Sequence, residues 1–278
     1  MKVCIDKKGG TPNPIFGLYN AYKERPTNLI LERNGETKQV DTVTKEFLNR
    51  AVQEKNMSLL HTLSNDRQNS LLELAMWRDK KWANGKVIRI RFLGGTQFLK
   101  GKVKEKALIW SRFANLDFDF VDNGDSEIRI SFQAGNGSWS YIGVDCLNVT
   151  DQTEPTMNFG WFDSTTPDNE FSRTVLHEFG HAIGCVHEHQ SPPANIPWDK
   201  PAVYRYYSAT QGWTQADVDN NIFAVYTKSK ISNSIFDRRS IMLYPIDGAL
   251  TGYKYTVGMN YFLSKNDIDY IKKWYPGR

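Results

Sequence analysis

The chain has 278 residues, of which 40% are hydrophobic and 24% are charged, with a formal net charge of +4. These values suit a globular protein of one large domain or two smaller ones, with enough chain to bury a core. Lysine and arginine are spread along the chain instead of forming a basic stripe, so no nucleic-acid partner is expected. No run reaches the ~18 apolar residues of a membrane span, so no membrane partner is expected either.

The N-terminal part of the chain differs in character from the rest. Residues 1 to about 40 lack periodicity, because glycine and proline interrupt them repeatedly. Their apolar and aromatic residues nevertheless predict that the segment lies against another part of the protein. Helical spacing of apolar residues then predicts helices over 43–61 and about 67–81. No apolar stretch follows Met1, so this chain is expected to carry no signal peptide.

From Lys86 onward the pattern becomes that of an α/β sheet. An amphipathic helix is predicted over 97–114. Alternating apolar residues predict strands over 86–92, 117–121, 127–132, 138–142 and 156–159.

A helix is predicted over 169–184, with Asp168 or Asn169 as its N-cap. Beyond it the chain is rich in loops, with short helices near 199–208 and 214–221. A last helix at about 265–274 follows Ser264 and Asp267, which resemble a capping box.

The chemistry is concentrated in residues 177–188, which read His-Glu-Phe-Gly-His-Ala-Ile-Gly-Cys-Val-His-Glu. His177 and His181 are four residues apart, so they share one face of a helix and can hold one metal ion. Gly184 lets the chain leave that helix at positive φ and return His187 to the same ion. Three imidazoles leave one position open, which predicts a single catalytic Zn²⁺. Glu178 then stands as the general base acting on a zinc-bound water.

This spacing, His-Glu-x-x-His-x-x-Gly-x-x-His, resembles the signature of the metzincin zinc proteases. The segment 240–245, Ser-Ile-Met-Leu-Tyr-Pro, is similar to the methionine turn that lies beneath the metal in that group, with Met242 as the turn residue. Glu188, directly after the third histidine, resembles the astacin branch. Tyr244 matches the astacin tyrosine, which in that family is a switchable zinc ligand that stabilises the transition-state oxyanion. Residues 139–143, Trp-Ser-Tyr-Ile-Gly, extend the resemblance, which covers roughly residues 75–275.

The resemblance implies an α+β metzincin fold. A twisted mixed sheet and the zinc-binding helix would form the N-terminal subdomain, and an irregular C-terminal subdomain would carry the methionine turn and a C-terminal helix. Residues 73–278 would be the zinc metalloprotease domain, and residues 1–72 a propeptide that could end as early as about 35–40. The family disulfides do not carry over, because Ser138 stands where one of the cysteines is expected.

The implied activity is that of a secreted zinc metalloendopeptidase in zymogen form, acting on protein or peptide substrates. Activation would come from another protease or from self-processing. In the family the freed N-terminus is buried near the glutamate after the third histidine, so Glu188 would receive it. An extended substrate would pair with an edge strand, for which residues 156–160 are the candidate.

The three cysteines, Cys4, Cys146 and Cys185, leave at least one thiol outside any intramolecular disulfide. Cys4 could be a fourth zinc ligand that keeps the precursor latent, in the manner of a cysteine switch. Asp6 is the rival ligand, because astacin precursors use an aspartate. Cys4 could also be unligated or disulfide-bonded. With Cys4 on the metal, Cys146 and Cys185 would be left to form a disulfide with each other or to remain buried free thiols.

Two other interpretations compete with a latent astacin-like protease. An enzyme of another metzincin branch is disfavoured by Glu188 and Tyr244. A non-catalytic, zinc-stabilised binding module is disfavoured by Glu178, since a dead protease commonly loses its base while it keeps its metal ligands.

Overall fold

The computed structural model describes residues 80–191, 193–225 and 236–278, together with residue 50 and the backbone of three short N-terminal strands. These strands are β1 (Cys4–Lys7), β2 (Ile30–Arg33) and β3 (Glu36–Gln39). The helices predicted over 43–61 and about 67–81 lie almost wholly outside the described residues.

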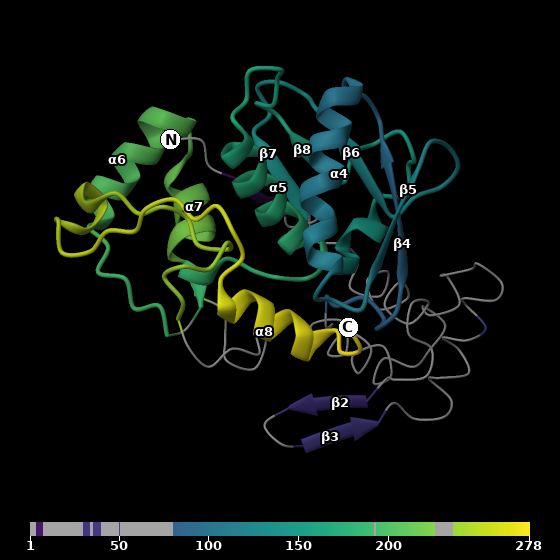
Figure 1. Cartoon of the computed structure of the whole chain (residues 1–278). Helices are drawn as coiled ribbons and strands as arrows, with labels where there is room; N and C mark the ends of the chain where they lie inside the picture. The colour runs from purple at the N-terminus through teal and green to yellow at the C-terminus, as the bar shows by residue number, and fades with distance from the viewer. Residues whose placement is uncertain are drawn as a thin grey trace.

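One mixed sheet of six strands organises the first half of the fold, in the order β1-β7-β8-β6-β4-β5 (Figure 1). The strands predicted from alternation are confirmed as β4 (Val87–Phe92), β5 (Asp117–Val121), β6 (Ile128–Ser131), β7 (Ser138–Tyr141) and β8 (Met157–Phe159). β4 runs parallel to β5 and β6, β6 runs parallel to β8, and β7 is antiparallel to β8. β2 and β3 form a separate antiparallel pair.

The N-terminal strand β1 occupies one edge of the six-stranded sheet. It runs parallel to β7, in a register that pairs Cys4 with Ser138 and Lys7 with Tyr141. For residues 4–7, the prediction that the N-terminal segment lies against another part of the protein is therefore confirmed.

The prediction that residues 156–160 form the edge strand is wrong. β8 lies between β7 and β6, and all three of its residues are buried. An alternating pattern in so short a segment does not distinguish an interior strand from an edge. In the described sheet, β7 is the strand that β1 covers.

Two long helices cover the same face of the sheet (Figure 1). Helix α4 (Gln97–Ser111) begins at Thr96, whose Oγ1 accepts a hydrogen bond from the N–H of Leu99 at 3.3 Å. Helix α5 (Asp168–Ala182) begins after Pro167, which replaces Asp168 and Asn169 as the N-cap. Its fixed φ suits the start of a helix. The Asp168 carboxylate instead binds α4, where it accepts from Lys106 Nζ at 2.8 Å.

Beyond α5 the described chain is made of loops and short elements, as predicted. They are η3 (Glu188–Gln190), α6 (Lys200–Gln211), α7 (Gln215–Val218), the π-helical turn η4 (Asp219–Phe223), η5 (Gly248–Thr251) and α8 (Lys265–Trp274). The turn η2 (Gly143–Asn148) lies between β7 and β8. The predicted capping box of α8 is confirmed, because Ser264 and Asp267 each accept from the other's backbone N–H.

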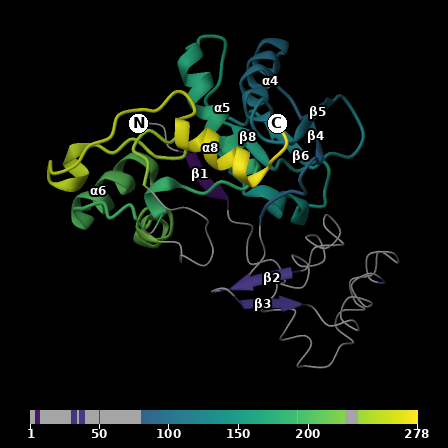
Figure 2. The same cartoon turned by 60° about the horizontal axis from the view of Figure 1, so that its bottom comes forward.

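Helix α8 packs back towards α5 (Figure 2). The Tyr275 hydroxyl, just past its end, donates to the carbonyl of Ile183 at 2.8 Å and accepts from the N–H of Trp82 at 3.0 Å. The Trp82 indole N–H in turn donates to the carbonyl of Ala182 at 2.8 Å. The end of the chain and the segment around residue 82 are therefore fixed together at the C-terminal end of α5.

Candidate metal centre and active site

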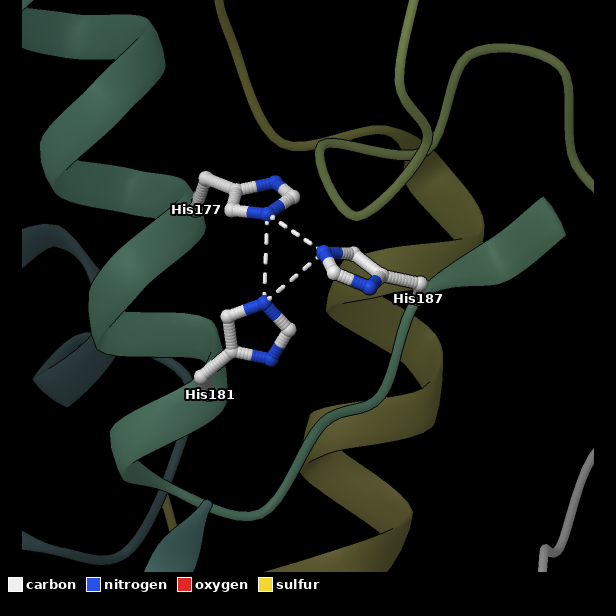
Figure 3. A group of neighbouring side chains, drawn as sticks. All are labelled: His177, His181 and His187. Carbon is white, nitrogen blue, oxygen red and sulfur yellow. Dashed lines mark hydrogen bonds between the residues drawn. The ribbon is translucent and has the colours of Figure 1, made fainter. Parts of the chain in front are cut away.

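Three buried histidines converge between α5 and the chain that follows it (Figure 3). The Nε2 atoms of His177 and His181 are 3.2 Å apart, and each lies 3.1 Å from Nε2 of His187. The structure therefore brings together the three residues that the sequence motif selected.

The outer nitrogens of two of these rings are fixed by main-chain carbonyls. His177 Nδ1 lies 2.8 Å from the carbonyl oxygen of Ile241, and His181 Nδ1 lies 2.9 Å from that of Cys185. A carbonyl oxygen can only accept, so both Nδ1 atoms carry the proton. The Nε2 lone pairs are consequently directed towards one another, which is the arrangement a metal-binding histidine needs.

The spacing of the nitrogens fits a zinc ion. Nitrogens bonded to one ion at about 2.0–2.1 Å with tetrahedral angles lie roughly 3.3 Å apart, close to the observed separations of 3.1–3.2 Å. Burial, together with the neighbouring His181 and His187, holds the pKa of His177 well below its usual range. The ring is thus neutral and able to bind a cation.

Two glycines shape the helix around these ligands. Gly184 has φ of +101° and ends the helix, so that the chain can turn back to His187. Gly180 lies between the histidines of α5, where an added Cβ would come within 2.4 Å of Met242 Sδ. A side chain at residue 180 would therefore displace Met242, which is buried in the turn just before Tyr244.

Tyr244 lies against the histidine cluster. Its ring centroid is 4.2 Å from that of His187 and 5.7 Å from that of His177. The side chain of Glu178, next to His177 on α5, is fully buried in the same region. The structure thus packs a phenol against the histidine cluster and buries the carboxylate that follows His177 along the helix.

Glu188 is tied to the turn that carries Met242. Its N–H donates to the Met242 carbonyl at 3.0 Å, and its Oε1 accepts from the N–H of Asp237 at 2.8 Å. Burial, with the nearby carboxylates of Asp267 and Asp237, raises the pKa of Glu188 to about 7.

We therefore expect Glu188→Gln to stabilise the zinc-free full-length protein at alkaline pH. The folded-state pKa of about 7 exceeds the ordinary value of 4.5, so the contribution of Glu188 is present below pH 4.5 and lost as the pH rises through 7. The variant should raise the free energy of unfolding at pH 8 by about 2–3 kcal/mol and leave it unchanged near pH 4. Denaturant unfolding at several pH values measures this, and identical pH profiles for the two proteins would contradict it.

The carboxylate of Asp267 has a second role besides capping α8. Its Oδ1 accepts from the Ser240 hydroxyl at 2.7 Å, and its Oδ2 accepts from the N–H of Ile241 at 2.8 Å. The carbonyl of that same Ile241 orients His177. Asp267 therefore links the C-terminal helix to the backbone that positions a candidate metal ligand.

The predicted disulfide between Cys146 and Cys185 is absent, because the two residues are buried but not bonded to each other. Both belong to the main hydrophobic core, where a thiol packs as a small apolar side chain. Burial raises the pKa of the Cys185 thiol, which disfavours the thiolate that disulfide exchange requires. The side chains of Cys4 and Asp6 lie outside what the structure describes.

The motif did not reveal the groups that orient the metal ligands. The carbonyls of Ile241 and Cys185 have no signature in the sequence, because every residue carries one. Asp267 was recognised only as part of a cap. His189 lies outside the group of three histidines, yet its ring stacks on Tyr244 at 4.9 Å.

A mixed sheet under an α-helix that supplies two histidines, with a third histidine after a glycine turn, defines a metzincin-type zinc peptidase. A structure of myroilysin is 49% identical in sequence with a TM-score of 0.70, and the match covers 72% of this chain and 98% of that one. A crystal structure of myroilysin, also 49% identical, matches with a TM-score of 0.58 over 71% of this chain and 86% of that one. The chain therefore belongs to the astacin-like metzincin metalloproteases, and it resembles myroilysin.

One more distant structure agrees on the fold, and one further protein matches in sequence. High choriolytic enzyme 1, a hatching enzyme zinc-protease from the medaka Oryzias latipes, is 17% identical with a TM-score of 0.50, over 71% of this chain and 94% of that one. Protein SpAN of Strongylocentrotus purpuratus is 32% identical over 117 residues, which are 41% of this chain and only 16% of SpAN. No family model matches the chain. Among the described residues, no helix is long and apolar enough to cross a membrane.

Proposed function

We propose that this protein is the latent precursor of a secreted zinc endopeptidase that cleaves protein substrates. The observation that carries the proposal is the convergence of three Nε2 atoms at 3.1–3.2 Å, with the buried Glu178 directly following His177 on α5. A single zinc ion placed among these atoms could be bound by all three imidazoles at normal Zn–N distances.

His177, His181 and His187 would hold one zinc ion. Bound there, zinc supplies a Lewis acid that lowers the pKa of a water molecule to about 7. Glu178 accepts a proton from the attacking water and delivers it to the leaving amine nitrogen. The Tyr244 hydroxyl donates a hydrogen bond to the oxygen of the scissile carbonyl as negative charge develops on it. Met242 provides the apolar floor beneath the histidines.

Latency is proposed to come from the N-terminal segment. β1 pairs along the whole of β7, so it occupies the edge at which an extended substrate would add a strand. Cys4 would supply a thiolate as the fourth metal ligand, which excludes the catalytic water. Asp6 remains the rival ligand.

The propeptide is proposed to be residues 1–72 and the protease domain residues 73–278. Residues from Lys80 onward are already built into the protease fold, since Lys80 Nζ binds Asp145 at 2.6 Å and Trp82 is fully buried. A cut that releases the domain would therefore fall before Lys80. Another protease or self-processing would make it, and the new N-terminus would approach Glu188, where its ammonium group would favour the charged carboxylate.

The experiment that tests the proposal is a comparison of the purified full-length chain before and after limited proteolysis. We expect one zinc per chain, no hydrolysis of a generic protein substrate before cleavage, and hydrolysis afterwards that a chelator abolishes. Full activity before cleavage would contradict the proposed latency of the precursor and would still support the proposed protease activity. A zinc-loaded, trimmed protein without hydrolytic activity would instead favour a zinc-stabilised binding module.

A further inference from the structure

His189 is the buried residue near the metal centre to which the proposed mechanism gives no part. It lies in η3, two residues after His187, and only 4% of it is exposed. Its ring stacks on Tyr244 with centroids 4.9 Å apart and an interplanar angle of 27°. It also stacks on His187 at 5.1 Å and 30°.

The His189 ring is anchored on its far side by the backbone. Its Nε2 lies 2.9 Å from the carbonyl oxygen of Asn221 in the π-helical turn η4. Since that oxygen can only accept, Nε2 carries the proton and donates it. The neighbouring Gln190 donates from its amide nitrogen to the next carbonyl, that of Asn220, at 2.9 Å. Two consecutive side chains of η3 thus hold two consecutive carbonyls of η4.

The π-helical turn is itself fixed to the elements around Tyr244. Ile222 of η4 belongs to the same buried cluster as Tyr244. The Tyr204 hydroxyl of α6 donates to Asp219 Oδ1 at 2.6 Å. His189 therefore connects a fixed backbone turn to the ring of Tyr244, because it binds the turn through Nε2 and stacks on the phenol. π-helical turns occur frequently at functional sites.

We infer that His189 is a positioning residue for the Tyr244 hydroxyl. Two of the imidazoles that contact the phenol, His177 and His187, would be held by the metal, whereas the His189 ring is held by its hydrogen bond to Asn221. Stacking on it restricts the tilt of Tyr244, so that the hydroxyl meets the developing oxyanion in one orientation. The inference rests on the proposed function, because it assigns a partner to a residue of that mechanism.

Two substitutions separate the ring from its anchor. His189→Phe keeps an aromatic ring against Tyr244 and loses the donor to Asn221. His189→Gln keeps an amide donor that can reach the same carbonyl and loses the ring. Gln190→Met is the matched control, because it removes the adjacent bond to η4 and leaves the ring in place.

On the processed protein, we expect kcat of His189→Gln to fall about tenfold with KM nearly unchanged, whereas Gln190→Met stays within about threefold of the original kcat. The kcat of His189→Phe should lie between these two values, because phenylalanine keeps the ring and loses the anchor. In a Tyr244→Phe background, His189→Gln should lower kcat no further, since the hydroxyl that it positions is gone. The zinc dissociation constant of the full chain should stay within about twofold in every His189 variant, because His189 does not bind the metal.

A measurement on the zinc-free protein tests the contact between residue 189 and Tyr244 without depending on the proposed enzymatic activity. In the zinc-free full chain, near-ultraviolet circular dichroism should change in His189→Gln and be retained in His189→Phe. The inference is overturned by an unchanged kcat or an unchanged aromatic signal in His189→Gln, by an equal loss in the Tyr244→Phe background, or by tenfold weaker zinc binding. A wild-type protein that hydrolyses nothing after processing would defeat the proposed function, and the zinc-free spectra would still decide whether residue 189 orders Tyr244.

Discussion

Replacing Glu178 with glutamine should abolish peptide hydrolysis while leaving zinc in place. Glutamine has nearly the same shape as the fully buried glutamate, so the surrounding helix keeps its packing. It cannot accept a proton from water, and loss of a general base lowers kcat by about 10³-fold or more when no other group replaces it. Hydrolysis of a fluorogenic peptide by the processed protein, with metal analysis of the same sample, measures both effects.

A ligand variant provides the contrast. His181→Ala removes one of the converging nitrogens, and it should lose activity and zinc together, whereas Glu178→Gln loses activity alone. Zinc loss in Glu178→Gln would mean that the carboxylate supports the metal site and not the chemistry. Retained kcat in that variant would exclude Glu178 as the base and would reopen the interpretation of the site.

Replacing Cys4 with alanine should convert the unprocessed chain from a silent to an active enzyme. If the Cys4 thiolate fills the fourth position on zinc, alanine leaves that position to water. The backbone pairing of β1 with β7 does not depend on the side chain at residue 4, so any gain in activity reports on the metal ligand. The measurement is hydrolysis by the intact chain, with electrophoresis of the same sample to show whether it processes itself.

Asp6→Ala is the matched control, because it lies on the same strand and removes the rival ligand. Activation by Asp6→Ala and continued latency of Cys4→Ala would assign the switch to the aspartate. Latency in both single variants and in the double variant would leave strand pairing alone as the inhibitory device. A thiol titration of the unprocessed wild type should show a thiol that becomes reactive only after cleavage or chelation.

The parts of this molecule that the sequence predicts well are those with local causes. Helix α5 and its ligands follow from the spacing of His177 and His181 and from the positive φ required at Gly184. The start of α8 follows from the capping box of Ser264 and Asp267. The strands β4 and β5 follow from alternation, because Ile88 and Ile90 of β4 are buried and the phenylalanines of β5 are half-buried between exposed aspartates.

The parts that the sequence did not predict depend on neighbours far along the chain. The candidate edge at residues 156–160 was wrong because local sequence does not give the order of strands in a sheet, and β8 pairs with β7 on one side and with β6 on the other. The Cys146–Cys185 disulfide was predicted mainly from the number of cysteines, whereas in the structure both side chains are buried in the hydrophobic core and are not bonded to each other. Pro167 is the N-cap of α5, and the Asp168 carboxylate accepts a hydrogen bond from Lys106 on α4 instead of capping the helix. Main-chain acceptors such as the carbonyl of Ile241 leave no trace in a residue pattern.

The link from α8 to the metal centre has a consequence for the timing of folding. A chain emerges from the ribosome N-terminus first, and its domains begin to fold in that order. The histidines of α5 are synthesised well before Asp267, whose carboxylate holds the backbone of Ile241 and, through it, the ring of His177. The hydrogen bond that Asp267 accepts from Ile241 can therefore form only after the last helix has been synthesised, so the C-terminal end of the chain completes the orientation of His177.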